Sequence, residues 1–289
     1  MKSNLLHSGE TALDRISTLK LPTLPAGTPF LLKSLTDENI DFVELATILE
    51  KFPSIAGKLI SLANSAWSAP VTAVSSLDAS CSRLGFGVVR STSIALAVAA
   101  PFNASRCPSF NPEYFWCSAL LSAEAASRMA QCAVVDNAAE PSTARAAGLL
   151  HNLGLLWLVD QIPAEAEEAM AMVKANQAAS LRQSMSHMLG YDQVEAGGYL
   201  ARQWNLPAQL AEAMTHYPEP NFAGDHCEIV TTVGLAVKLI SAILREEPHF
   251  ETDERQPRLG ITGENFEAIS KQLTGQLANT RQIAKVLIG

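Results

Sequence analysis

The residues with the clearest chemical potential are His151 and Asn152, the one polar pair in the apolar run from Gly148 to Leu156. A buried histidine followed by an aspartate would be typical of half a metal site. Asparagine instead supplies a neutral carbonyl and an amide, whereas hard divalent ions are held largely by anionic oxygens. The pair therefore indicates a hydrolase-like site from which a negative charge is missing.

A metal-dependent phosphohydrolase would need several histidine ligands and at least two aspartates, because its ions activate water and bind the phosphate. His151, His187 and His216 could converge in a helical bundle. Asn152 removes one carboxylate, however, and residues 229–244 contain no Asp or Glu. We therefore predict no catalytic metal and interpret His151 as a core histidine that bonds a backbone group or Asn152.

Other catalytic or cofactor-binding patterns are weaker still. The sequence has no G-x-S-x-G element, and Gly85-Phe86-Gly87 lacks the lysine and the preceding strand of a phosphate-binding loop. We interpret this glycine pair as a helix end followed by a turn. The five cysteines form no C-x-x-C pair and are predicted to be buried thiols. No cofactor is expected.

Composition limits the possible partners. The chain has 289 residues, of which 48% are hydrophobic, and a net charge of −8 from 21 basic and 29 acidic residues. General nucleic-acid binding is not expected, because it needs clustered Lys and Arg. The segment from Met1 to Arg15 has no apolar stretch of the signal-peptide type, and Ile94 to Phe102 is too short to span a bilayer. We expect a cytoplasmic protein without membrane contact.

Helical periodicity without convincing strand patterns predicts an all-α fold that positions these residues. Thr36 is predicted to cap one helix, with Asp37 and Glu38 in its first turn. Residues 142–159 are predicted to form a single helix that carries His151, and residues 247–260 a loop. Another helix is predicted to begin at Pro53. The remaining helices are predicted to span residues 76–85, 88–100, 112–132, 163–176, 180–189, 193–204, 207–216, 228–246 and 266–287.

The proline-rich segment 101–112 suggests a boundary between two helical subdomains. We predict an N-terminal arm over residues 1–20, a first subdomain over 21–105, a second over 106–247, and a loop with a terminal helix over 248–289. The acidic residues Glu165, Glu167 and Glu168 are expected to form a solvated helix face. The four tryptophans are interpreted as core or interhelical packing residues. The alternative, a docking aromatic, is most plausible for Trp67.

The order of several short motifs resembles the HDOD family, bacterial domains that are distantly related to HD-type phosphohydrolases. The resemblance covers residues 20–245. Its most specific parts are the Ala-Asn-Ser segment at 63–65 and the Trp-x-Leu-Pro joint at 204–207. The other matching segments are 21–25, 44–46, 58–66, 84–85, 115–116, 148–154 and 216–217.

The resemblance implies two packed helical subdomains and a signalling role without phosphate hydrolysis. Family members commonly have His-Asp at the position of His151-Asn152, His at the positions of Ser118 and Gln193, and His-His at His216-Tyr217. Each departure removes or weakens a potential metal ligand.

The sequence therefore predicts a regulatory module that binds a protein partner in a signalling pathway. We expect contacts near Asn64, Ser65, Trp67 and Trp116, in a groove between the two helical parts. Two alternatives stay open at this point. One is a divergent phosphohydrolase acting on a nucleotide or cyclic dinucleotide, and the other is a pseudo-enzyme that binds a nucleotide without cleaving it. The oligomeric state is not predicted.

Overall fold

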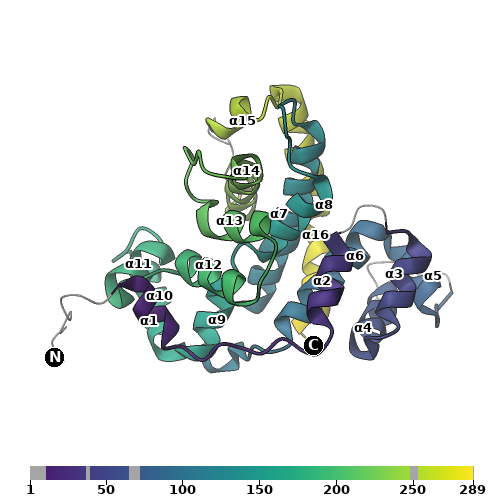
Figure 1. The fold of residues 1–289 in the computed structure, drawn as a ribbon, viewed down its shortest axis with the longest axis horizontal. Helices are drawn as coiled ribbons and strands as arrows, with labels where there is room; N and C mark the ends of the chain where they lie inside the picture. Colours follow the sequence, from purple (N-terminus) through teal and green to yellow (C-terminus); the bar gives the residue numbers. More distant parts are fainter. Residues whose placement is uncertain (1–10, 37–39, 65–71, 248–252, 289) are drawn as a thin grey trace. The chain divides into compact units, whose positions relative to one another are not determined.

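The computed structural model describes residues 11–36, 40–64, 72–247 and 253–288, and all regular structure in these ranges is helical (Figure 1). The predicted all-α fold is confirmed. The first eight elements are α1 (Ala12–Ser17), α2 (Thr28–Thr36), α3 (Phe42–Leu49), α4 (Pro53–Ala63), α5 (Leu77–Leu84), α6 (Phe86–Ala99), the 3-10 helix η2 (Ala104–Arg106) and α7 (Pro112–Cys132). They are followed by α8 (Pro141–Leu150), α9 (Leu153–Gln161), α10 (Pro163–Lys174), α11 (Leu181–Leu189), α12 (Gln193–Gln203), α13 (Ala208–His216), α14 (Cys227–Leu244), α15 (Arg255–Arg258) and α16 (Gly263–Ile288).

The chain divides into two compact units, each assembled from segments that are separate in sequence. Unit 1 comprises Met1–Pro22, Phe102–Phe110 and Asn152–Leu206, and unit 2 comprises Thr23–Pro101, Asn111–His151 and Pro207–Gly289. The division expected from the sequence, into an arm (1–20), two subdomains (21–105 and 106–247) and a terminal part (248–289), stays a prediction.

Unit 1 is held together by a close approach of α9 and α12. A Cβ atom added at Gly154 would lie 2.1 Å from the Gln193 carbonyl oxygen and 2.3 Å from the Gly197 nitrogen. The indole N–H groups of Trp157 and Trp204 donate to the carbonyl oxygens of Lys20 and Pro22, at 3.1 and 2.9 Å. These bonds fix the extended segment that follows α1, and they confirm core roles for both tryptophans.

The acidic helix α10 also has a structural task in unit 1. Glu167 accepts hydrogen bonds from the backbone N–H of Ser109, at 2.8 Å, and from the Cys107 thiol, at 3.3 Å. It thereby anchors the segment around η2. Glu165 and Glu168 are exposed as predicted, but Glu167 is half-buried. The prediction of a uniformly solvated acidic face was therefore wrong for Glu167, because its partners are far away in the sequence.

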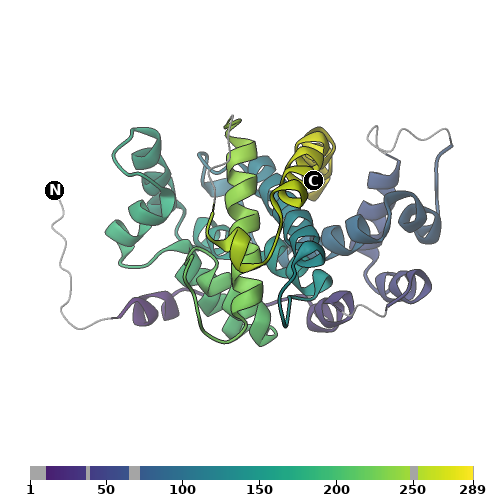
Figure 2. The same cartoon turned by 90° about the horizontal axis from the view of Figure 1, so that it is seen from above.

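Unit 2 is built around the long helix α7, against which α8, α14 and α16 pack (Figures 1 and 2). The crossing of α7 and α8 is so close that a Cβ at Gly148 would lie 2.6 Å from the Ser122 carbonyl oxygen. Among the described helices, α14 alone is long and apolar enough to cross a membrane, and 61% of its apolar window is buried. Its packing on α7, α8 and α13 is that of a core helix.

Local signals placed many helix ends correctly, and three predictions were wrong. Thr36 is the last residue of α2 instead of a cap, and Asp41 caps α3 by accepting the Glu44 N–H at 2.8 Å; Asp37 and Glu38 lie outside the described residues. The predicted helix 142–159 is two helices, α8 and α9, with a break at His151 and Asn152. The segment predicted as a loop contains α15.

Candidate functional site

His151 closes the C-terminal end of α8 and is buried, with 3% of its surface exposed. Its Nδ1 lies 2.7 Å from the Gly148 carbonyl oxygen. Because a carbonyl only accepts, Nδ1 carries the proton in this contact. The Tyr217 ring lies edge-on against the imidazole, with ring centroids 5.1 Å apart. The prediction of a core histidine bonded to a backbone group is confirmed by this geometry.

Burial lowers the pKa of His151 from 6.5 to about 4, and the hydrogen bond to Gly148 only partly opposes this effect. Desolvation disfavours the charged imidazolium, since an apolar surrounding does not replace its hydration. At neutral pH the ring is therefore uncharged, with one nitrogen committed to the backbone.

Tyr217 is held beside His151 by residues that the sequence analysis did not single out. Arg255, on α15, donates to the carbonyl oxygens of Tyr217 and Pro218, at 3.3 and 3.1 Å. Its guanidinium also pairs with Asp253 at 3.0 Å. Gly234 of α14 allows the Tyr217 backbone to approach this helix closely, because a Cβ at this position would lie 2.4 Å from the Tyr217 carbonyl oxygen. A polar segment with proline gave no local signal for this role.

His216 does not share the site of His151 in unit 2. Its Nδ1 lies 2.9 Å from Glu219 and its Nε2 3.6 Å from Glu212, and its ring stacks on Phe222 with centroids 4.4 Å apart. Ser118, also in unit 2, is half-buried on α7. The aromatic ring packed against His151 is instead that of Tyr217, the residue after His216.

Asn152 and Gln193 lie at the starts of α9 and α12, the two helices that meet at Gly154 in unit 1. The Asn152 Oδ1 and the Gln193 Oε1 are buried, and neither has a hydrogen-bond partner among the described residues. A buried acceptor without a donor is costly. Both atoms could accept a bond from a ligand or a water, but as neutral amide oxygens they are poor ligands for a divalent ion.

The described part of the chain contains no group of three or more His, Cys, Asp or Glu side chains arranged to hold a metal ion. The five cysteines are free thiols; Cys81, Cys107 and Cys117 are buried as predicted, whereas the prediction was wrong for Cys132 and Cys227, which are partly exposed. Burial raises the pKa of Cys81 and of Cys117 to about 11, so these two are protonated at neutral pH. The side chains around His151 can therefore bind through neutral hydrogen bonds and ring contacts.

Two of the predicted partner-binding residues are described by the structure. Asn64 ends α4, and its amide exchanges two hydrogen bonds with the backbone of Val74, at 2.7 and 2.8 Å. Trp116 is 4% exposed and packs edge-on against Phe115. Docking on Trp116 would need a rearrangement, so its role stays a prediction. Ser65 and Trp67 lie outside the described residues, as do His7 and His249.

The chain is thus an all-α protein with a buried histidine at the break between two helices. The chain belongs to the HDOD family, since the model of the HDOD domain matches residues 21–220. The family predicted from the motifs is thereby confirmed. None of the curated proteins matches the chain at a significant level.

Several solved structures share this fold. A candidate signal transduction protein from Marinobacter aquaeolei VT8 is 22% identical, with a TM-score of 0.81 over 94% of this chain and 61% of its own, so this chain spans less than two thirds of it. A candidate phosphohydrolase from Shewanella amazonensis SB2B is also 22% identical, with a TM-score of 0.71 over 96% and 99% of the two chains. An HDOD domain protein of unknown function from Geobacter sulfurreducens is 20% identical, with a TM-score of 0.72 over 95% and 97%.

Proposed function

We propose that this chain is a cytoplasmic, non-catalytic regulatory module that acts by binding another protein in a signalling pathway. Its membership of the HDOD family supports a regulatory role. The observation that carries the non-catalytic part is the setting of His151, which is neutral, bonded to a backbone carbonyl and packed against Tyr217. A change in the packing of the helical parts would expose or hide the partner-binding face.

The competing function is metal-dependent hydrolysis of a phosphate ester, as in a divergent HD-type enzyme. Such an enzyme needs anionic oxygens to hold the ions that activate water. In this chain the position after His151 offers the neutral amide of Asn152. A nucleotide-binding pseudo-enzyme is a second alternative, favoured by the unpartnered oxygens of Asn152 and Gln193, which could accept bonds from the amino groups of a base.

Metal content and phosphatase activity test the non-catalytic part. Elemental analysis of the purified protein should show no stoichiometric Fe, Mn, Ni or Zn, and a screen of phosphate esters with added Mn²⁺ should stay at background. His187→Ala, which changes an exposed histidine, is the control. The proposal would be refuted by turnover that is lost in His151→Ala and kept in His187→Ala. Both residues are described, and His187 is exposed on α11.

Asn152→Asp provides a sharper form of this test. We expect the new carboxylate to destabilise the protein at neutral pH, because it would be buried where the asparagine oxygen finds no donor. Burial raises a carboxyl pKa, so the loss should shrink as the pH falls and the group becomes protonated. Stabilisation of this variant by Mn²⁺ would instead show that the site can hold a metal ion.

Capture from lysate of the native host tests the partner-binding part. We expect the wild type to retain a specific protein and Trp67→Ala to retain less of it. Val134→Ala, which changes a side chain that is 77% exposed, is the matched surface control. Equal recovery by wild type, variant and control would contradict the proposed docking region, and no specific recovery by the wild type would contradict the binding function itself.

A further inference from the structure

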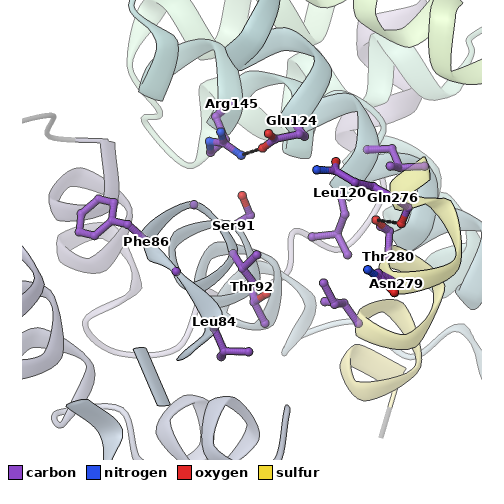
Figure 3. Close-up of a pocket in the computed structure, with 15 residues that line it drawn as sticks. Leu84, Phe86, Ser91, Thr92, Leu120, Glu124, Arg145, Gln276, Asn279 and Thr280 are labelled. Carbon is purple, nitrogen blue, oxygen red and sulfur yellow. Dashed lines mark hydrogen bonds and ion pairs between the residues drawn. The ribbon is translucent and has the colours of Figure 1, made fainter. Parts of the chain in front are cut away.

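A cavity of about 400 Å³ lies within unit 2, where α5, α6, α7, α8 and α16 meet (Figure 3). Its size falls within the range of small-molecule sites. Leu84, Leu120, Leu121 and Ile283 supply apolar wall. Ser91, Thr92, Asn279 and Thr280 supply hydroxyl and amide groups, and Arg145 and Glu124 are its charged residues. None of these residues was assigned to the His151 site.

The N-terminus of α6 faces this cavity through Phe86, Gly87 and Val88. Gly85 serves as the N-cap without a side-chain hydrogen bond. It adopts φ 81° and ψ 154°, a conformation that is almost restricted to glycine. The first N–H groups of a helix have no partner within the helix. An N-terminus of this kind carries a partial positive charge of about half a unit.

Arg145 adds a full positive charge at the same place. A Cβ built on Gly87 would lie 3.5 Å from the Arg145 guanidinium, so the cation sits directly beside the helix N-terminus. Like charges at this distance repel, and an anion placed between them relieves the repulsion. Figure 3 shows Arg145 and Glu124 paired at the edge of the cavity.

Glu124 does not fully balance this charge. Its carboxylate pairs with both Arg145 and Arg128, the second at 2.6 Å. Burial alone would raise the pKa of Glu124, but the two guanidinium groups outweigh it and hold the pKa below its usual value. The cluster therefore holds two cations and one anion, and the helix end adds to the positive excess.

The hydroxyl of Ser91 is a second and independent sign of a ligand. Ser91 is 4% exposed, its Oγ is buried without a hydrogen-bond partner, and it points toward Arg145 and Glu124 (Figure 3). Thr92, which is fully buried, also lines the cavity with an unpartnered hydroxyl. By contrast, the hydroxyls of Thr232, outside the cavity, and of Thr280, in its wall, donate to the carbonyl four residues back. The hydroxyls of Ser91 and Thr92 have no such bond.

We propose that this cavity binds a small organic anion, with its carboxylate or phosphate at the N-terminus of α6 beside Arg145 and its apolar body against Leu120 and Ile283. The Ser91 hydroxyl donates to the anion. Ligand binding here requires neither catalysis nor the His151 site, so it stands apart from the proposed partner-binding function. It would supply the module with a chemical input signal.

Phenyl phosphate and benzoate are suitable probes, with phenol and benzamide as their neutral counterparts. We expect one or both anions to raise the melting temperature of the full chain by about 3 °C at ten times the Kd. The phosphate and carboxylate arms distinguish the two head groups. Equal effects of an anion and its neutral counterpart would overturn the proposal, as would the absence of any shift.

Charge variants at Asn279 test the location with little effect on folding, because this residue is exposed on α16 while it lines the cavity. We expect Asn279→Asp to raise the Kd of the anionic probe about 2- to 5-fold and Asn279→Lys to lower it by a similar factor. Arg145→Gln should raise the Kd about 10-fold or more. Unchanged Kd values in all three variants would refute the site.

Ser91→Ala has a matched control in Ser93→Ala. Both residues are buried on α6 with unpartnered hydroxyls, but Ser93 does not line the cavity. Calorimetric titration should show a Kd raised several-fold in Ser91→Ala and unchanged in Ser93→Ala. Equal changes in the two variants would show that the Ser91 hydroxyl does not contact the anion.

Discussion

The buried imidazole of His151 should make the stability of the protein depend on pH in a defined window. The pKa is about 4 in the folded chain and 6.5 for an unburied histidine. A group with a lowered pKa in the folded state binds fewer protons when folded, so unfolding takes up a proton as the pH falls below 6.5. The contribution of His151 to the free energy of unfolding is complete above pH 6.5, decreases between pH 6.5 and about 4, and is lost below. The difference between the two pKa values is equivalent to about 3 kcal/mol of unfolding free energy.

His151→Asn removes the titrating group and places an amide nitrogen near the position of Nδ1, where it can still donate to the Gly148 carbonyl. The smaller side chain lowers the free energy of unfolding at every pH, so the informative quantity is the difference between wild type and variant. We expect this difference to shrink by about 3 kcal/mol from pH 7.5 to pH 4. Carboxylates titrate in both proteins, so their contributions cancel.

Urea unfolding at a series of pH values, followed by circular dichroism, measures this difference. His187→Asn is the control, because it removes an exposed histidine of α11 and leaves the buried one in place. Between pH 7.5 and pH 4, the free energy of unfolding of the control should change by as much as that of the wild type. Parallel stability curves for wild type and His151→Asn would show that burial does not hold His151 neutral, and the electrostatic argument for its role would fail.

Three further substitutions test the packing that positions the site. Gly154→Ala should destabilise unit 1 by about 3 kcal/mol, because the new Cβ meets the backbone of α12. Gly57→Ala, at an exposed helix position with open space around it, should stabilise the protein by about 0.5 to 1 kcal/mol in the same urea titration. Asp253→Asn should lower the free energy of unfolding by about 3 kcal/mol, because the buried Arg255 loses its ion pair. Glu247→Gln removes an exposed ion pair and is the control; a smaller loss in Asp253→Asn than in this control would refute the prediction. Gly85→Ala should cost about 1 to 3 kcal/mol through backbone strain alone, since nothing lies within 4 Å of its Cβ position; an unchanged melting temperature would contradict the role given to its conformation.

Local sequence signals were sufficient where a helix end is decided by its own residues. Pro53 begins α4, Ser76 caps α5, and Asn111 with Pro112 begins α7. Such residues act through backbone geometry and short hydrogen bonds within one turn, so they can be recognised without a tertiary structure. The family and the all-α fold were predictable for the same reason, because their motifs are local.

The break at His151 shows why the rest was not predictable. No proline interrupts the run from Leu149 to Leu156, and its composition favours one continuous helix. Just after the break, Gly154 fits against the backbone of Gln193 and Gly197, which lie far along the chain in α12. Likewise, the role of Arg255 depends on carbonyl oxygens 38 and 37 residues away. Contacts of this range leave no periodic signature in the sequence.

The buried polar atoms that have no hydrogen-bond partner differ in whether a bound molecule could supply one. Ser93 and Ser122 lie in packed helix contacts, whereas Ser91 lines a cavity that α6 and α16 both form. A ligand shifts a conformational equilibrium only by binding one state more tightly than another. An anion that touches α6 and α16 together binds tightly only while these helices are packed, so it should favour the packed state. Amide hydrogen exchange in α16 should therefore slow when the anionic probe binds, and the neutral counterpart should leave it unchanged.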